Sequence, residues 1–308
     1  MADTLTELPS EVEAVVRPRA MRVVADRRGS MVWDAESPHG RVAVKVGYAV
    51  DGKRGYTALA PAREASVLRA LGRPHIAYGT WERGTFSVQP WYDGVALWPL
   101  WEYRRKGPQA PIDYETAAQC AEALNRLHSD GWVHGDMQPA HLIADGGIVH
   151  LIDLAFAHGG SVNSRYDFPY PGCLVHYEAP EISRAVLATG TATPSPAADV
   201  YALGASLLIS ATGIRPMEYP DHAEREEQRQ AVVDNKRRPF DLPGSFGVMV
   251  DRMLSYEPYD RPALSEVVAE FRAATKGEPK GKAPTGADPA ASPPGRPVGV
   301  DPRGGGRG

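Results

Sequence analysis

The feature that most constrains the fold of this chain is a pair of aspartates on either side of a short hairpin. Asp136 lies in the run from His134 to His141 (HGDMQPAH), and Asp153 follows the apolar run from Ile148 to Ile152. Between them, Asp145-Gly146-Gly147 has the composition of a hairpin turn. A hairpin folds the chain back, so the two carboxylates can lie side by side. Such a pair suits a metal-nucleotide site, although two surface aspartates around an ordinary hairpin would look the same.

The composition describes a globular chain and excludes several kinds of site. The 308 residues are 43% hydrophobic and carry a formal net charge of −4, which gives no reason to expect nucleic acid or an anionic membrane as a partner. Cys120 and Cys173 are the only cysteines, too few for a disulfide framework or a thiolate zinc cluster. The longest apolar run, 200–209, is shorter than the ~20 residues that span a bilayer. Residues 1–18 lack a signal pattern, so we expect a cytoplasmic protein.

Residues 20–94 are expected to form a small antiparallel sheet with one helix, after a polar lead-in over residues 1–19. Short runs rich in Val, Met and Trp, separated by turn residues, predict five strands at 20–24, 31–35, 41–46, 76–81 and 85–89. Apolar periodicity predicts a helix from Tyr56 to Leu71. Lys45 lies on the third strand and Glu64 in the middle of the helix. Both could instead be solvated residues, which are common at edge strands and on helices.

Residues 95–275 are expected to be mainly helical. Apolar periodicity predicts four helices, at 114–128, 199–211, 246–254 and 265–274. The segment 154–178 lacks periodicity and is rich in Gly, Ser, Tyr and Pro, which predicts a long functional or mobile loop. Residues 276–308 hold 7 Pro, 9 Gly and no aromatic residue, which predicts a disordered tail.

The order of these parts resembles the eukaryotic-type protein kinase family, which includes bacterial serine/threonine kinases, over about residues 20–274. Single motifs of this family match many unrelated sequences, but several in the right order are specific. The resemblance implies an α+β, bilobal fold with a small antiparallel sheet lobe plus one helix and a larger, mainly helical lobe. The motifs that carry it are VAVK (42–45), Glu64, HGD (134–136), DLA (153–155), YEAPE (177–181), DVYALG (199–204) and EPYDRP (257–262).

The resemblance also implies a role for each site residue. Lys45 would contact the nucleotide phosphates and be held by Glu64, Asp136 would be the catalytic base, and Asp153 would hold a metal ion. His141 stands where the family has a second metal ligand. The implied cofactors are ATP and Mg²⁺ or Mn²⁺. Nucleotide contacts are further expected from Gly29, which lies in a turn, and from Gln89 and Trp91, which lie at the junction of the two lobes.

Two structural roles follow from the same resemblance. Asp199 would stabilise the backbone of the loop that carries Asp136. Arg261 would pair with Glu181 in a structural bond that takes no part in catalysis.

The chain departs from the family pattern at several positions. The turn before the second strand contains only Gly29, where the family has three glycines whose backbone amides approach the phosphates. We therefore expect this turn to cover the nucleotide differently. Arg27 or Arg28 could supply the missing phosphate contacts. His141 replaces an asparagine and suits Mn²⁺ better than Mg²⁺. Gly135 replaces the usual arginine, so activation by loop phosphorylation is not expected. Gln138 and Leu174 also differ from the residues usual in kinases that act on proteins.

The expected function is therefore an ATP-dependent phosphotransferase, most readily a serine/threonine protein or peptide kinase. Three alternatives remain open. A pseudokinase that serves as a binding or scaffold module would explain the reduced glycine turn and His141. A small-molecule phosphotransferase, similar to the aminoglycoside and choline enzymes, would explain the HGD motif. A kinase acting on a precursor peptide in lanthipeptide-type dehydration is also compatible. The sequence does not indicate the oligomeric state.

Overall fold

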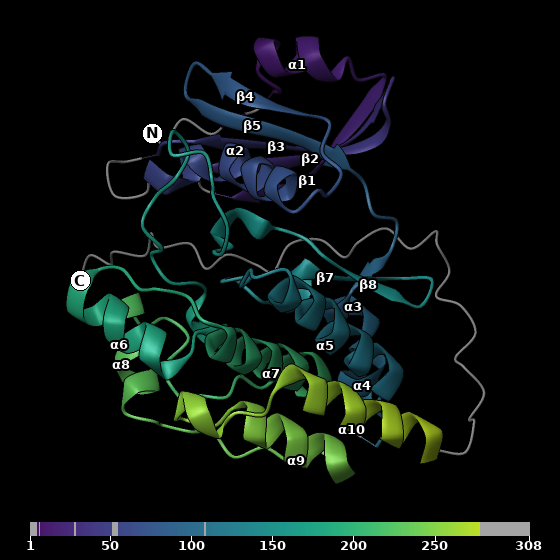
Figure 1. The fold of residues 1–308 in the computed structure, drawn as a ribbon, viewed down its shortest axis with the longest axis vertical. Coiled ribbons are helices and arrows are strands. Elements are labelled where there is room, and N and C mark those ends of the chain that lie inside the picture. The colour runs from purple at the N-terminus through teal and green to yellow at the C-terminus, as the bar shows by residue number, and fades with distance from the viewer. Residues whose placement is uncertain (1–4, 6, 28, 51–54, 108, 278–308) are drawn as a thin grey trace, which may run out of the picture.

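The computed structural model describes residues 5, 7–27, 29–50, 55–107 and 109–277 and shows two lobes, one above the other (Figure 1). The upper lobe contains a sheet and the lower lobe is mainly helical, so the predicted α+β bilobal fold is confirmed. The tail predicted over residues 276–308 lies outside the described residues except for its first two, which belong to the last helix. Within the described part of the chain, no helix has both the length and the apolar character that crossing a bilayer requires.

The N-lobe contains a five-stranded antiparallel sheet in the order β1-β2-β3-β5-β4. Each predicted strand overlaps one of these. On β3, Val44 and Val46 are buried in the core of the lobe, and the alternation of side chains along a strand places Lys45 on the opposite face. The strands are β1 (Ala20–Arg27), β2 (Ser30–Ser37), β3 (Gly40–Tyr48), β4 (Ala77–Trp81) and β5 (Gly84–Pro90).

Two helices lie on opposite sides of this sheet (Figure 1). Helix α2 (Gly55–Ala70), close to the predicted bounds, lies on the side of the C-lobe. Helix α1 (Ser10–Val16) lies on the far side, where Val12 and Val16 are buried against the strand core. The polar composition of residues 1–19 predicts only a lead-in. A helix forms there because two valines four residues apart face the sheet together.

The C-lobe is built around α7 (Pro196–Thr212), in which every residue from Ala198 to Ala211 is buried. The four predicted helices are confirmed as α5 (Tyr114–Ser129), α7, α9 (Gly244–Met253) and α10 (Leu264–Gly277). The remaining elements were not predicted. They are α3 (Leu97–Leu100), α4 (Glu102–Lys106), α6 (Pro180–Thr189), α8 (Arg225–Val233) and the 3-10 turns η1 (Pro139–His141), η2 (Leu154–Phe156), η3 (Val175–Tyr177) and η4 (Pro258–Asp260).

A small sheet at the top of the C-lobe contains the predicted hairpin. Strands β7 (Leu142–Asp145) and β8 (Ile148–Leu151) are antiparallel, and β6 (Val95–Ala96) pairs with β7. The two turn residues, Gly146 and Gly147, both have positive φ (54° and 88°), as a tight hairpin turn of two residues requires. The hairpin therefore returns the chain to its start and delivers Asp153 next to the loop of Asp136.

Candidate active site

Lys45, Glu64 and Asp153 form a charged cluster between the lobes. The Lys45 Nζ atom lies 2.8 and 2.7 Å from the two Glu64 carboxylate oxygens and 3.5 Å from Asp153 Oδ1. Burial disfavours the lysine charge, but Asp153 and Glu64 outweigh it and raise the pKa of Lys45. The Glu64 side chain is 1% exposed. A solvated lysine and a solvated glutamate are therefore ruled out, and the predicted pair is formed.

Asp153 is held in an unusual backbone conformation. Its φ of 62° and ψ of 57° lie in the left-handed region, which costs a non-glycine residue about 1–2 kcal/mol. Such strain is typical of functional sites. The Leu154 amide that follows donates to Glu64 Oε1 over 3.2 Å, so the same glutamate orients both Lys45 and the start of the DLA segment.

Asp136 lies on the loop before η1, in the C-lobe. Gln138 Nε2 donates to Asp136 Oδ2 over 3.2 Å, and His141 Nδ1 lies 2.8 Å from the Asp136 carbonyl oxygen. Burial raises the pKa of the Asp136 carboxyl; His141 opposes this shift and Asp153 reinforces it. A raised pKa brings a carboxylate closer to the range in which a general base works well. The Asp136 side chain is 15% exposed and so is not sealed from solvent.

Asp199 fixes the backbone of this loop, as the resemblance implies. Its carboxylate accepts hydrogen bonds from the amides of His134 (2.6 Å) and Gly135 (2.9 Å) and lies 2.9 Å from His128 Nε2. Gly135 has a φ of 77°, and a Cβ atom there would lie 2.6 Å from the Phe156 carbonyl oxygen. The family's arginine therefore cannot replace Gly135 unless the Phe156 backbone moves.

The fit of a divalent ion rests on His141 and Asp153. His141 Nε2 lies 3.2 Å from Asp153 Oδ2, a separation that two neighbouring ligands of one ion can have. The Nδ1 contact with a backbone carbonyl is the second interaction that metal-binding histidines usually make. The described residues contain no cluster of three or more His, Cys, Asp or Glu suited to a metal. A divalent ion held by these two side chains would take its other ligands from phosphates and water.

The three remaining residues predicted to contact the nucleotide lie in different environments. Gln89 is buried on β5, on the same sheet face as Lys45, whose strand partner is Ser87. Trp91 follows β5 and stacks on the Arg41 guanidinium at 4.8 Å. Gly29 has a φ of 85°, and a Cβ there would meet Thr57 at 2.7 Å. The positive φ and the close approach of α2 explain why residue 29 is a glycine. Its contact with the nucleotide stays a prediction.

Two buried arginines bind the 154–178 segment, and no local sequence pattern predicts these contacts. Arg63, 1% exposed, donates to the carbonyls of Ala155 (2.6 Å) and Ala157 (2.9 Å). Arg229 donates to both oxygens of the buried Glu178, at 2.7 and 3.0 Å. Their partners are 51 to 94 residues away, too far for any local pattern to indicate the pairing.

The family-implied structural bond is also present. Arg261 donates to Glu181 through both terminal nitrogens, at 2.7 and 2.8 Å. This bidentate pair joins the start of α6 to the segment after η4, far from the carboxylates of the cleft.

Comparisons with known proteins agree with this geometry. The family model described as protein kinase domain matches residues 41–271. The serine/threonine-protein kinase PkaA of Streptomyces coelicolor is 30% identical over 56% of the chain, and PknK of Mycobacterium tuberculosis is 30% identical over 66%. PknB of Mycolicibacterium smegmatis is 29% identical over 72%. The matched regions make up 32%, 18% and 36% of these three relatives, respectively.

The family model covers three quarters of the chain, and the structure has two lobes with the Lys45–Glu64 ion pair between the sheet and α2. The chain therefore belongs to the protein kinase family, a family of phosphotransferases.

Proposed function

We propose that this chain is an ATP-dependent kinase that transfers the γ-phosphate to a serine or threonine hydroxyl of a protein or peptide. The observation that carries the proposal is the Lys45 amine, which lies within 3.5 Å of both Glu64 and Asp153, while His141 lies between Asp153 and Asp136, within 4 Å of both carboxylates. Kinase chemistry consists largely of positioning the reactants and neutralising phosphate charge, and these side chains supply both.

Each residue has a distinct task in the proposed reaction. Lys45 contributes positive charge to the nucleotide phosphates, and Glu64 keeps its amine in place. Asp153 and His141 would hold a divalent ion, whose charge would neutralise the β- and γ-phosphates. Asp136 orients the acceptor hydroxyl. As the hydroxyl oxygen bonds to the γ-phosphorus and the bond from that phosphorus to ADP breaks, the hydroxyl proton passes to the Asp136 carboxylate.

The protein or peptide acceptor is supported by the C-lobe. The segment from Asp153 to Glu178 is packed on the C-lobe, with Tyr170, Val175 and Tyr177 in its core. Glu178, the last residue of this segment, is fixed by Arg229. A small-molecule acceptor would not need such an ordered platform.

A second candidate is a binding module without turnover. His141 Nε2 contacts the same Asp153 carboxylate that would hold a metal ion, and a histidine in contact with that oxygen could take the place of the ion. In that case the chain would keep the fold and the Lys45–Glu64 pair without transferring phosphate.

An acceptor panel with two lysine variants tests the proposal. Wild type, Lys45→Met and Lys106→Met are incubated with γ-labelled ATP, Mg²⁺ or Mn²⁺, and peptides that contain Ser, Thr or only Ala. Lys106 is a matched control because it is exposed on α4, where it pairs with Glu102 one turn away. We expect label on Ser/Thr peptides that Lys45→Met reduces at least ~100-fold and Lys106→Met leaves unchanged. Label on an aminoglycoside alone, or no label with intact ATP binding, would contradict the proposal.

A further inference from the structure

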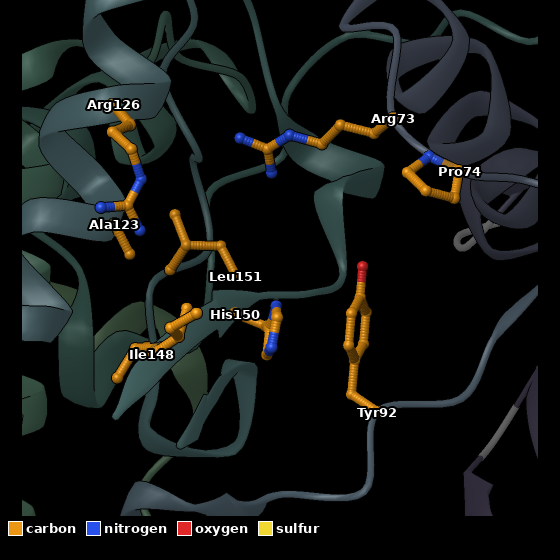
Figure 2. A pocket seen from close by; sticks show the side chains of 9 residues that line it. Arg73, Pro74, Tyr92, Ala123, Arg126, Ile148, His150 and Leu151 are labelled. Atoms are coloured by element: carbon orange, nitrogen blue, oxygen red, sulfur yellow. The ribbon is translucent and has the colours of Figure 1, made fainter. Parts of the chain in front are cut away.

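A second pocket lies on the side of the molecule formed by the lobe junction, α5 and β8, and contains none of the residues of the candidate active site. It has a volume of about 260 Å³ and is lined by elements of both lobes (Figure 2). Arg73 comes from the loop after α2, Tyr92 from the lobe junction, Arg126 from α5 and His150 from β8. A ligand in this pocket would touch both lobes at once.

The two arginines give this pocket its charge. Figure 2 shows both guanidinium groups turned toward the space between them. Among the described residues, neither guanidinium has a hydrogen-bond or ion-pair partner within contact distance, whereas at least eleven other arginine side chains do. Burial lowers the pKa of Arg73, and although Asp130 and Tyr92 oppose this, the charge of Arg126 adds to it. Two positive charges thus face one cavity, and within the described part of the chain no carboxylate touches either of them.

The opposite wall of the pocket is flat and partly apolar. The Tyr92 and His150 rings are stacked, with centroids 4.3 Å apart and an interplanar angle of 23°. Next to them, Ile148 is 55% exposed although it is a large aliphatic side chain. A solvent-exposed isoleucine and a stacked ring pair next to these two guanidinium groups suit a ligand with an anionic end and an apolar or planar end.

We propose that this pocket binds a phosphate monoester. A planar guanidinium can donate two parallel hydrogen bonds to phosphate oxygens, and two arginines from separate elements can approach one phosphate from two sides. A phosphate dianion neutralises both arginines, whereas a single carboxylate leaves one of them uncompensated. The cavity is also larger than a phosphate group, so it leaves room along Ile148 and His150 for the group that carries the phosphate.

Binding would add a further link between the two lobes at the end of α2. Arg73 follows α2, the helix that carries Glu64, by only three residues. A ligand held by both Arg73 and Arg126 would tie the end of this helix to α5 of the C-lobe. The inference does not depend on the proposed function, because it uses no residue of the cleft.

The test is an NMR titration that observes the His150 ring, so that binding near Lys45 does not contribute. The probes are inorganic phosphate, O-phospho-L-serine and a phosphoserine peptide, with acetate as the monovalent comparison, at low ionic strength. The variants are Arg73→Gln, Arg126→Gln and both together. Arg69→Gln is the matched control, because Arg69 is an exposed arginine in the last turn of α2 and outside the pocket.

We expect the phosphate probes to shift the His150 resonances and acetate to bind more weakly. Each Arg→Gln change should weaken binding about tenfold, the size of one lost charge-assisted interaction, and Arg69→Gln should leave it unchanged. Arg73→Lys and Arg126→Lys keep the positive charge and control for loss of folding in the Arg→Gln variants. They should bind the phosphate probes with an affinity between those of wild type and the Arg→Gln variants. A phosphopeptide that binds more tightly than O-phospho-L-serine would identify a protein as the source of the phosphate, and equal binding would identify a small ester. An unmoved His150 resonance, or equal binding by wild type and the double variant, would overturn the proposal.

Discussion

Arg63 Nε donates a 2.9 Å hydrogen bond to the Asp167 carboxylate, 104 residues further along the chain. The same guanidinium binds the carbonyls of Ala155 and Ala157, so α2 holds both the start and the middle of the 154–178 segment. Arg63 directly precedes Glu64, which orients Lys45. Helix α2 therefore contacts both the 154–178 segment, through Arg63, and Lys45, through Glu64.

This relationship predicts activity without phosphorylation of the segment. Arg63→Gln should lower the phosphate-transfer rate at least ~10-fold and the free energy of unfolding by about 2–4 kcal/mol, because buried carbonyls lose charged donors. Asp167→Asn should have a much smaller effect on stability, since its side chain is half exposed. Phosphatase treatment of wild type should leave the rate unchanged. A wild-type rate that falls after phosphatase treatment would contradict this account.

A second prediction concerns the buried pair of Glu178 and Arg229. Arg229→Met should lower the free energy of unfolding by about 3–5 kcal/mol, because it leaves the Glu178 carboxylate buried and uncompensated. Chemical denaturation measures this loss. Arg252→Met is the matched control, because Arg252 and its partner Glu266 are both about half exposed, and it should change stability little. Equal losses of unfolding free energy in the two variants would contradict the prediction that the buried Arg229–Glu178 pair matters more for stability than the exposed pair.

The loss of folding stability at acidic pH should depend on His134. Burial lowers the pKa of His134 to about 4, from about 6.5 in an unfolded chain; Asp199 and Asp153 oppose this shift and His141 adds to it. The unfolded chain then binds more protons between these values, so stability rises with pH in this window. The contribution of His134 is complete above pH ~6.5 and is lost as pH falls toward ~4, by up to about 3 kcal/mol. NMR titration of the ring measures the value directly. Protonation of His134 near pH 6.5 would refute this prediction.

Metal preference should depend on His141. An imidazole ligand favours Mn²⁺ over Mg²⁺, so the ratio of the rates with Mn²⁺ and Mg²⁺ should be above one in wild type. His141→Asn should bring this ratio closer to one, because an amide oxygen is a harder ligand. Rates at saturating ATP with each ion provide the measurement. A ratio that His141→Asn leaves unchanged would remove His141 from the metal site.

The sequence predicted most of the regular structure, because long amphipathic helices and alternating strands leave local patterns. The hairpin was predictable from Gly146 and Gly147, and α7 from its continuous apolar run. Helix α1 was missed because it is only seven residues long and its two buried residues, Val12 and Val16, are too few to establish a helical period. Helix α8 has few apolar positions and buries an arginine, which no periodicity indicates.

The same distinction applies to the site. Lys45, Glu64, Asp136 and Asp153 stand in motifs, so the amino-acid sequence alone was enough to predict that they lie close together. Arg63 and the two arginines of the second pocket depend on tertiary contacts between distant segments, which leave no local pattern. At Gly135 the sequence shows only that the family's arginine is missing. The fold supplies the physical cause, a backbone oxygen where a side chain would begin.

The most direct measurement of the central claim compares phosphate transfer and ATP binding in Asp136→Asn and Asp145→Asn. Asp145 is a matched control because it is an exposed aspartate in the hairpin next to the site. The account predicts that Asp136→Asn lowers the transfer rate by ~10²–10⁴-fold while ATP affinity stays within a few-fold, because a general base acts on the acceptor and not on the nucleotide. Asp145→Asn should behave like wild type. Transfer at the wild-type rate by Asp136→Asn would contradict the account.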